Sequence, residues 1–350
     1  MIPISELCTR PTAWLASPGN HGAIAVSTRI RLARNSAAHP FPRRLDGRQQ
    51  ADLADHVLDR IDRAIDWRDA HIHRMRDCTD AERQALCERQ LISRELASGK
   101  RPGALYASED EHVALMVNEE DHLRLQVIAH GLDLEGALDQ AVALDRRLEA
   151  HLPWAVHRDY GYLCSCPTNV GTGMRASVML HLPALAETQD LRQVLRGLSK
   201  LHLTVRGLHG EGSDASGHFY QISNQRSLGQ TETEITAGLL EAVERIIQYE
   251  EIARQSLAET GRTKIEDRCW RAFGLLTNAR SLAYDELIDQ LSWVRLGTAL
   301  EILPVRSWPI LDRILVHTQP AHLQLRHDQA ETAVVRDRLR AELVRNWLMP

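Results

Sequence analysis

The hydrophobic pattern of this 350-residue chain changes near residue 228, and that change limits the folds that the chain can adopt. Before this point, short runs that are typical of β-strands are mixed with helical patterns. After it, the pattern is almost purely helical. We therefore predict an α+β fold, in which residues 1–228 form a domain with a mostly antiparallel sheet flanked by helices and residues 229–350 form an all-helical domain.

The first part contains strand-like runs and helical segments in irregular order. Because they do not alternate regularly, a mixed or antiparallel sheet fits better than a doubly wound parallel sheet. Helices are expected over 46–66, 134–151 and 184–201. Strands are expected over 23–32, 104–108, 113–118, 162–166, 177–182, 201–207 and 218–223.

The second part begins with a helix-start signal. Thr231 and Glu234 have the spacing of a capping box, with Thr231 as the N-cap residue. Apolar residues then recur at helical intervals from Ile235 to Ile252. Further helices, punctuated by prolines, are expected over about 264–276, 282–296, 308–317 and 331–347.

Charge and composition exclude several classes of protein. The formal net charge of -5 gives no reason to expect general nucleic-acid binding. No apolar stretch is long enough to span a bilayer, and the first residues lack the pattern of a signal peptide. The six cysteines are scattered, which indicates reduced thiols rather than a disulfide framework. We expect a cytoplasmic protein.

Arginines at the ends of several expected strands suggest an anion site. In a strand, Arg29 and Arg31 project from the same face, and their guanidinium groups repel each other unless an anion lies between them. Arg124, Arg175 and Arg206 stand at other strand ends. The chain has no Walker-type loop and no GxGxxG motif, so polyphosphate would have to be bound through side chains. A solvated basic strand edge is the alternative for the first pair taken alone.

Two acidic segments could serve a cationic substrate. Residues 118–121, with the sequence NEED, follow an expected strand. Residues 210–217 form a glycine-rich loop that could close over a ligand. A charged surface turn and a long hairpin connection are the respective alternatives.

Cysteine and histidine residues give weaker signals. Cys164 and Cys166 have no second thiol pair at zinc spacing nearby. Cys166, near arginines, could have a depressed pKa and exist as a thiolate, or it could be a buried inert cysteine. A metal site can be drawn from four residues, but the sequence between them is typical of a charged helix; they are His71, His73, Cys78 and Cys87.

Together these motifs resemble those of the phosphagen (ATP:guanido) kinases. The sequences STRIRLARN, VNEEDHLR, CPTNVGTGMRASV, VRGLHGEG and QISNQRSLG stand in the family's order and at its approximate spacing between residues 24 and 229. The resemblance implies the catalytic fold of that family and ATP-dependent transfer of a phosphoryl group to a guanidinium nitrogen.

Within this family, the chain is similar to the bacterial protein-arginine kinases of the McsB type. The first arginine motif begins at residue 27, so we expect the N-terminal helical domain of the small-guanidino kinases to be absent. More than a hundred residues follow the last motif, and they contain the sequence RDRLRA. It matches the signature with which the subfamily binds phosphoarginine, which implies an allosteric site at Arg336, Asp337, Arg340 and Ala341.

The resemblance also implies roles for the motif residues. Glu120 matches the leading general base, Glu211 the carboxylate that orients the guanidinium, and Cys166 a thiolate that contacts the substrate. Mg²⁺ would be held through the nucleotide phosphates. The segments implied in ATP binding contain Ser27, Thr28, Arg29, Ile30, Arg31, Arg124, Arg175, Ala176, Ser177, Val178, Met179, Arg206, Gly207, Leu208, His209 and Gly210.

Three positions depart from the pattern of the family. Gln90 stands where relatives usually have a histidine near the adenine, and Met116 stands where the small-guanidino kinases have a tryptophan. Both bear on adenine stacking and nucleotide affinity. Asp214 replaces a glutamate that is common among the bacterial relatives.

The expected function is that of a protein-arginine kinase, which phosphorylates arginine side chains in other proteins. The alternatives are a kinase of free arginine or another small guanidino metabolite, and a catalytically silent adaptor that binds phosphoarginine. The subfamily implies a homodimer and three partners: a zinc-binding activator protein, a protease chaperone and a transcriptional repressor. Direct binding to nucleic acid or membrane is not expected.

Overall fold

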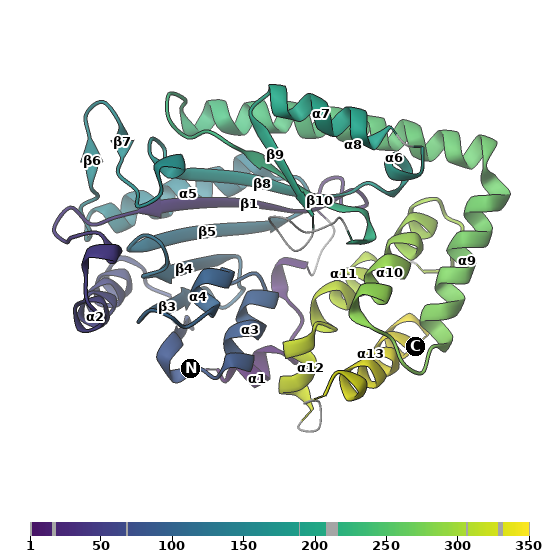
Figure 1. Ribbon diagram of the computed structural model, residues 1–350, viewed down its shortest axis with the longest axis horizontal. Coiled ribbons are helices and arrows are strands. Elements are labelled where there is room, and N and C mark those ends of the chain that lie inside the picture. Colours follow the sequence, from purple (N-terminus) through teal and green to yellow (C-terminus); the bar gives the residue numbers. More distant parts are fainter. Residues whose placement is uncertain are drawn as a thin grey trace.

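An eight-stranded antiparallel sheet forms the centre of the molecule (Figure 1). The computed structural model describes residues 2–15, 19–67, 69–188, 190–207, 216–305, 307–327 and 332–349. The strands lie in the order β2-β3-β4-β5-β1-β8-β10-β9, and every neighbouring pair is antiparallel. The expected fold class is therefore confirmed. The strands are β1 (Ala25–Arg34), β2 (His71–Arg74), β3 (Ala104–Ala107), β4 (Val113–Val117), β5 (Leu123–His130), β8 (Met174–His181), β9 (Leu203–Gly207) and β10 (Phe219–Asn224).

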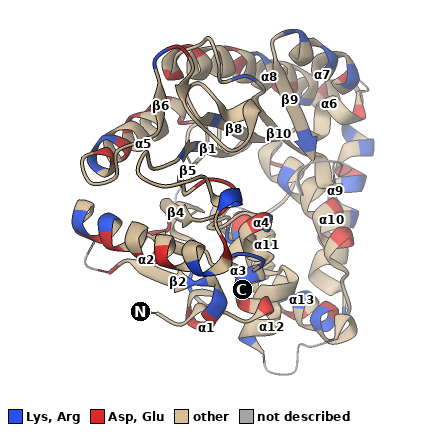
Figure 2. Cartoon of the chain, turned by 60° about the vertical axis from the view of Figure 1, so that its left-hand side comes forward, with Lys and Arg blue, Asp and Glu red and all other residues tan. Residues whose placement is uncertain are grey.

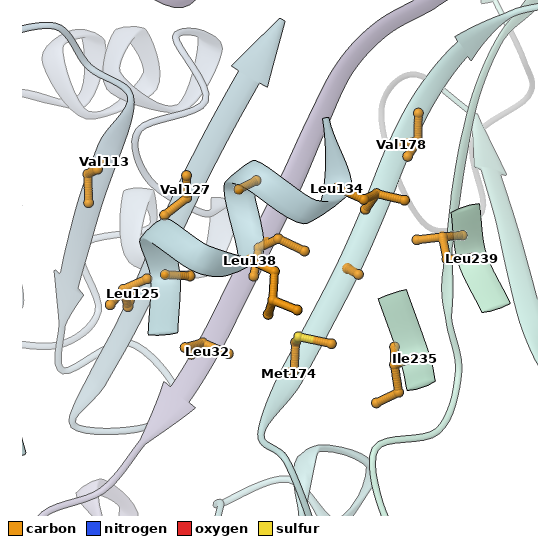
Figure 3. Close-up of a cluster of buried hydrophobic side chains, with 14 of the residues drawn as sticks. Leu32, Val113, Leu125, Val127, Leu134, Leu138, Met174, Val178, Ile235 and Leu239 are labelled. Atoms are coloured by element: carbon orange, nitrogen blue, oxygen red, sulfur yellow. The ribbon is translucent and has the colours of Figure 1, made fainter. Parts of the chain in front are cut away.

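One face of the sheet is covered by long helices. Leu32, Leu125 and Val178 point from the strands toward Leu138 and Leu239 of two of these helices (Figure 3). Each leucine or valine buried in this way contributes about 1.5–3 kcal/mol to folding. The helices of this layer are α2 (Gly47–Ala64), α5 (Leu134–Glu149), α7 (Leu191–Lys200) and α8 (Glu232–Thr260).

Among the described residues, the opposite face is covered at its two ends and also over Ile128 of β5, which packs against Trp14 and Val316. At the β2–β4 end, Leu105 and Met116 pack under short helices that include one from the C-terminal part of the chain. These helices are α1 (Ile4–Leu7), α3 (Asp80–Glu88), α4 (Arg94–Ala97) and α12 (Pro320–Arg326). At the β10 end, Val26 and Phe219 join the core of the C-terminal helices. The middle of this face is left for polar side chains.

The C-terminal part is helical, as expected. The capping box is confirmed, because Thr231 accepts the N–H of Glu234 and the carboxylate of Glu234 accepts the N–H of Thr231. The helix that it starts, α8, follows the boundary expected near residue 228 but packs Ile235 and Leu239 into the core of the sheet. The remaining helices are α9 (Arg262–Asn278), α10 (Tyr284–Ala299), α11 (Trp308–His317), α12 and α13 (Ala333–Leu348).

Several expected elements differ from the structure. The segment 162–166 is not a strand beyond β7 (Gly161–Tyr162), which pairs with β6 (Val156–His157) outside the main sheet. The helix expected over 184–201 is divided into α6 (Pro183–Glu187) and α7. Strands β2 and β5 were not expected. Basic and acidic residues are interspersed on outer helices such as α2 (Figure 2), and no described helix is long and apolar enough to cross a membrane.

Candidate active site

Five arginines from four strands lie on the same face of the sheet. Directly opposed residues of an antiparallel pair point to the same side, and Arg31 of β1 lies opposite Arg175 of β8. Arg124 of β5 lies opposite Ala33, two residues beyond Arg31. The alternation then places Arg29 and, through β10, Arg206 of β9 on this side as well. The structure therefore brings together the arginines that the sequence singled out.

These arginines border a cleft and a smaller cavity beside it. The cleft has a volume of about 500 Å³ and is lined by Arg31, Arg124, Arg175 and Arg206, together with Glu120 and Cys166. The smaller cavity has a volume of about 80 Å³, and its lining includes Arg29, Gln90, Ser177 and Met179. One continuous strip of positive charge thus runs from the cleft to the cavity.

The positively charged arginines of this cluster repel one another. Burial, followed by the charges of Arg175 and Arg124, lowers the pKa of Arg29 to about 10. Burial and the neighbouring guanidinium groups also hold the pKa of Arg31 well below its usual range. The Nε of Arg31 is buried and has no hydrogen-bond partner among the described residues. A polyanion in the cleft would reduce the repulsion between the guanidinium groups and would supply the missing hydrogen-bond acceptor.

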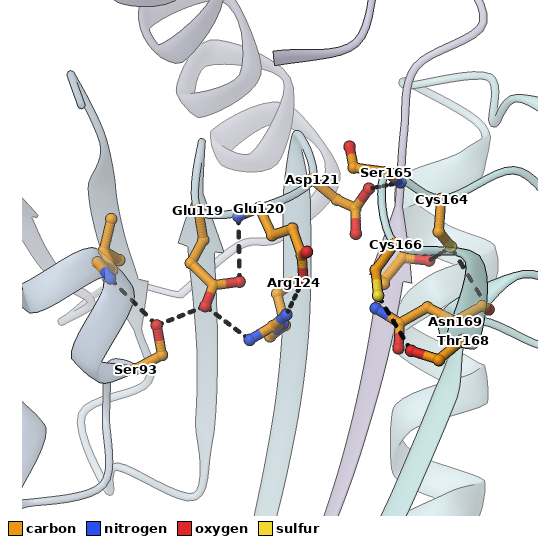
Figure 4. Close-up of polar contacts among 12 residues, drawn as sticks. Ser93, Glu119, Glu120, Asp121, Arg124, Cys164, Ser165, Cys166, Thr168 and Asn169 are labelled. Atoms are coloured by element: carbon orange, nitrogen blue, oxygen red, sulfur yellow. Dashed lines mark hydrogen bonds and ion pairs between the residues drawn. The ribbon is translucent and has the colours of Figure 1, made fainter. Parts of the chain in front are cut away.

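The NEED segment forms the turn between β4 and β5, and its two glutamates have different environments (Figure 4). The side chain of Glu119 is only 3% exposed, and its Oε1 accepts hydrogen bonds from Ser93 Oγ at 2.5 Å and Arg124 Nη1 at 2.7 Å. The side chain of Glu120 is 28% exposed and lines the cleft. Glu119 therefore holds an arginine in place, whereas Glu120 is available to a ligand.

Glu120 lies close to two cations but is not tightly paired. Its Oε2 is 3.5 Å from Nη2 of Arg124, and its Oε1 is 4.0 Å from Nη2 of Arg43. Burial raises the pKa of Glu120, an effect that Arg124 opposes and Asp121 and Glu119 reinforce. A carboxyl with a raised pKa at the edge of the cleft is suited to accept a proton near neutral pH.

Asp121 ties this turn to the segment that carries Cys166. Its buried Oδ1 accepts hydrogen bonds from Asn35 Nδ2 and from the backbone N–H of Ser165, both at 2.6 Å. Cys166 Sγ lies 3.0 Å from Thr168 Oγ1 at the wall of the cleft (Figure 4). Burial raises the pKa of the nearby Cys164 thiol to about 12. The two cysteines of the segment are therefore not equivalent.

Arg34 supports the cleft from behind. It is buried in a bidentate pair with Asp145, with Nη2 and Oδ2 2.7 Å apart, and it donates to the carbonyl oxygen of Thr172. Gly173, at φ 63°, has no room for a side chain because a Cβ there would lie 2.6 Å from the carbonyl oxygen of Ala33. Gly173 thus allows two segments of the chain to approach each other closely.

Some residues implied in ATP binding do not present their side chains to the cleft. Thr28, Ile30, Ala176 and Val178 are fully buried on the opposite face of the sheet, where the long helices pack. Only their backbone could contact a nucleotide. Glu211, together with Leu208, His209, Gly210 and Asp214, lies outside the described residues.

Two of the positions that depart from the family pattern have clear surroundings. The Oε1 of Gln90 accepts a hydrogen bond of 3.0 Å from Nη1 of Arg29. Met116 is buried opposite Arg124 in the β4–β5 pair. His71, His73, Cys78 and Cys87 do not form a cluster that could hold a metal ion, and the described residues contain no such group elsewhere.

The RDRLRA segment lies on α13, and its members differ in exposure. Arg336 and Asp337 are half-buried, whereas Arg340 and Ala341 are buried. The guanidinium of Arg340 donates to the carbonyl oxygens of Thr318 and Leu282 and to the carboxylate of Asp337. Arg340 therefore connects α13 to the end of α11.

Sequence reasoning missed the residues that hold the cleft together. Glu119, Asp121 and Arg34 belong to the same motifs as the site residues, but nothing in the sequence separates them from their neighbours. Ser93 lies outside every motif. Arg34 is the exception, because the alternation of strand residues places it on the face opposite Arg29 and Arg31.

Comparisons with known proteins identify relatives along the whole chain. Residues 52–253 match the family model of the ATP:guanido phosphotransferase C-terminal catalytic domain, and residues 262–350 match that of the C-terminal domain of the protein-arginine kinase McsB. The chain is 44% identical to a protein-arginine kinase of Symbiobacterium thermophilum, over 97% of this chain and 98% of that protein. It is 40% identical to one of Geobacillus stearothermophilus, over 95% of each chain.

Solved structures of guanidino kinases have a similar fold. The duplicated taurocyamine kinase from Schistosoma mansoni aligns with a TM-score of 0.60 and 25% identity, over 67% of this chain and 34% of that one. This chain thus spans about a third of the duplicated enzyme. A lombricine kinase aligns with a TM-score of 0.58 and 20% identity, over 71% of each chain, which shows the shared fold.

Proposed function

Because the chain belongs to the ATP:guanido phosphotransferase family, in its protein-arginine kinase branch, we propose that it transfers the γ-phosphoryl group of ATP to the guanidinium of arginine residues in other proteins. The observation that carries this proposal is the strip of arginines on one face of the sheet, with Glu120 at its edge. It offers a polyanion site and a proton acceptor in one cleft.

In this proposal the arginines bind the nucleotide phosphates. Arg29, Arg31, Arg124, Arg175 and Arg206 supply planar donors that match phosphate oxygens. Their charge also stabilises the transferring group, and loss of one such donor typically costs on the order of 10²–10³ in rate. The described residues contain no cluster of metal ligands, so Mg²⁺ would bind through the phosphate oxygens of the nucleotide. It would supply charge neutralisation of the β- and γ-phosphates.

The acceptor guanidinium needs help because its nitrogens carry no free lone pair while it is protonated. We propose that Glu120 accepts hydrogen bonds from the guanidinium and then a proton from the attacking nitrogen. A bond forms between that nitrogen and the γ-phosphorus, the bond from the γ-phosphorus to the bridging oxygen breaks, and ADP leaves. The raised pKa of Glu120 fits this role.

Glu211 and Cys166 complete the proposed acceptor site. Glu211 would orient the guanidinium; its role rests on its sequence motif. Cys166 lies at the wall of the same cleft as Glu120, where its sulfur can contact the acceptor. We assign it a tuning role rather than a step of its own.

The proposal that the substrates are proteins is supported by the relatives, which are named protein-arginine kinases and match over nearly the whole chain. The test is incubation of the purified protein with Mg-ATP and an arginine-containing protein, followed by mass spectrometry under conditions that preserve P–N bonds. We expect phosphoarginine in the protein substrate and little ADP release with free arginine. Release of ADP with free arginine alone would instead favour a kinase of a small metabolite.

We also propose that the RDRLRA segment binds phosphoarginine as an allosteric signal. Arg336 and Asp337 would contact the ligand, while the buried Arg340 and Ala341 would hold the pocket in shape. Titration with phosphoarginine tests this, with Arg336→Ala as the variant that should lose binding. If the chain bound phosphoarginine but no nucleotide, it would be an adaptor rather than a kinase.

The proposed localisation, oligomeric state and partners are those expected for the protein-arginine kinase branch of the family. We propose a cytoplasmic homodimer that acts with a zinc-binding activator protein, a protease chaperone and a transcriptional repressor. Size determination in solution and affinity purification from the native cell test these proposals.

A further inference from the structure

Glu88 joins the catalytic sheet layer to the C-terminal helices. It is the last residue of α3, and it is buried. Its carboxylate accepts hydrogen bonds of 3.0 Å from the backbone N–H groups of Ala321 and His322, and it lies 2.9 Å from Nδ1 of His322. These N–H groups are in the first turn of α12, where a helix has no partners of its own for them. Glu88 therefore supplies the cap for a helix more than two hundred residues away in the chain.

Gln90, two residues after Glu88, holds one of the five arginines of the site in place. Gln90 accepts the hydrogen bond of Arg29, and its own backbone has φ 65°, an uncommon conformation for a residue with a side chain. Its carbonyl oxygen accepts a 2.6 Å hydrogen bond from Nε2 of Gln126. Gln90 is a neutral acceptor, so it orients Arg29 without cancelling its charge. A strained backbone conformation of this kind persists only where surrounding contacts fix it, and such residues are often found at functional sites.

The segment that Glu88 caps is also held from the other side. Arg340 donates from Nε to the carbonyl oxygen of Thr318 at 2.9 Å, three residues before Ala321. Between them, Gln319 donates to the carbonyl oxygen of Glu88 at 3.4 Å. Glu88, Gln90, Gln319 and Arg29 all line the small cavity. A continuous series of contacts thus leads from α13 to the arginine cluster.

We propose that Glu88 is a positioning residue of the nucleotide site: by anchoring the end of α3 to α12, it fixes Gln90 and, through it, the guanidinium of Arg29. The inference rests on the proposed function, in which Arg29 binds a nucleotide phosphate. Arg29 has like charges on two sides, so without a fixed acceptor its guanidinium would turn away from them. The C-terminal helices would then be required for full nucleotide affinity, although they supply none of the five arginines.

The chain contains a matched control for this residue. Glu250 of α8 is also buried, and its carboxylate accepts the backbone N–H groups of Ala184 and Leu185 at 3.2 and 2.9 Å. These residues begin α6, another short helix with a proline in its first turn. Glu250 also lies in a buried pair with Arg254, and it lines neither the cleft nor the small cavity. It therefore has the same capping function without a path to the arginines.

The experiment compares Glu88→Gln and Glu250→Gln in the full-length protein. The dissociation constant for Mg-ATP is measured by direct titration, the melting temperature by calorimetry, and KM for ATP and kcat by steady-state kinetics. We expect both variants to melt at lower temperature than the wild type. Only Glu88→Gln should bind Mg-ATP more weakly, by about 3- to 10-fold, with a parallel rise in KM for ATP and a kcat within about twofold of wild type.

Gln319→Ala is a milder variant for the case that Glu88→Gln does not fold. It removes a hydrogen bond to the backbone of Glu88 from the half-buried wall of the cavity, and it should weaken Mg-ATP in the same direction. Unchanged affinity in the folded variant, or an equal loss in Glu250→Gln, would overturn the inference. If the wild type itself did not bind Mg-ATP, the proposed function would fail, which is a different result from an unaffected Glu88→Gln.

Discussion

Glu119 and Arg124 form an ion pair of 2.7 Å in which Glu119 is almost fully buried, and this pair separates the tasks of two adjacent glutamates. Arg124 is held by Glu119 on one side, while Glu120 stands 3.5 Å away on the side of the cleft. One carboxylate therefore positions a phosphate ligand, and the next is left for the acceptor. This division makes the two residues distinguishable by kinetics.

Glu119→Gln and Glu120→Gln should affect different constants. Glu120→Gln removes the proposed base, so kcat should fall by on the order of 10²–10⁴ with little change in KM for ATP. Glu119→Gln weakens the anchor of Arg124, so KM for ATP should rise more than kcat falls. Steady-state kinetics on a protein substrate measure both. Near-normal kcat in Glu120→Gln would show that another group takes the proton.

Arg31 and Arg34 on the same strand should respond in opposite ways to replacement by methionine. Arg31→Met removes one of several mutually repelling charges, so the melting temperature of the free protein should stay level or rise. The stabilisation by Mg-ATP, about 2.7 kcal/mol at 100 times the dissociation constant for the wild type, should largely disappear.

The control, Arg34→Met, breaks the buried pair with Asp145 and should cost about 3–5 kcal/mol of folding free energy. Calorimetry with and without Mg-ATP measures both effects. If Arg31→Met destabilised the free protein, this would contradict the view that the charges of the clustered arginines repel one another and lower its stability.

The pH dependence of the reaction should reflect the raised pKa of Glu120. A base works only when it is deprotonated, so kcat/KM should fall as the pH decreases through the pKa of this group in the free enzyme. Because burial raises that pKa, the fall should occur at higher pH than for an ordinary glutamate. Arg43 lies 4.0 Å from Glu120 and lowers its pKa, so Arg43→Ala should move the fall to still higher pH. An unmoved profile in this variant would argue against Glu120 as the group observed.

Alkylation should distinguish Cys166 from the other thiols. Burial raises the pKa of Cys164 and Cys269 to about 12 and of Cys87 to about 11, so these thiols should react slowly at neutral pH. Cys166 lines the cleft and should be labelled first by iodoacetamide. Peptide mass spectrometry reads the sites, and Cys166→Ser should retain activity after treatment. Faster labelling of Cys164 would contradict the structure of this segment.

The sequence predicts most of the fold because local patterns determine most of its elements. The helix over 308–317 is found with these bounds, and the capping box at Thr231 is present. The segment 162–166 was predicted as a strand from its composition, but Asp121 binds its backbone from another part of the chain. Contacts of this kind between distant segments leave no local signal. β5 was not predicted either, although Leu123, Leu125 and Val127 alternate with polar residues in the pattern of a half-buried strand.

The site is predictable in part for the same reason. Alternation along β1 places Arg29 and Arg31 on one face, and the register then adds arginines of other strands. The buried roles of Glu119 and Asp121 depend on which direction each residue of a tight turn takes, and the sequence does not specify this. Gln90 contacts the site directly through Arg29, but the link of Glu88 to the C-terminal part runs through α12, a helix that was not predicted.

The position of β1 in the middle of the sheet has a consequence for the order of folding. β1 is the first strand to be synthesised, yet its partners come much later, since Ser27 pairs with His130 and Ala25 with Leu180. Closing such long loops is slow, because the chain loses conformational entropy before the stabilising contacts between the strands form. We expect proteolysis of ribosome-bound chains to show β1 protected only after β8 has emerged. Two of the five arginines proposed to bind phosphate therefore lie on a strand that is synthesised well before either of its partner strands.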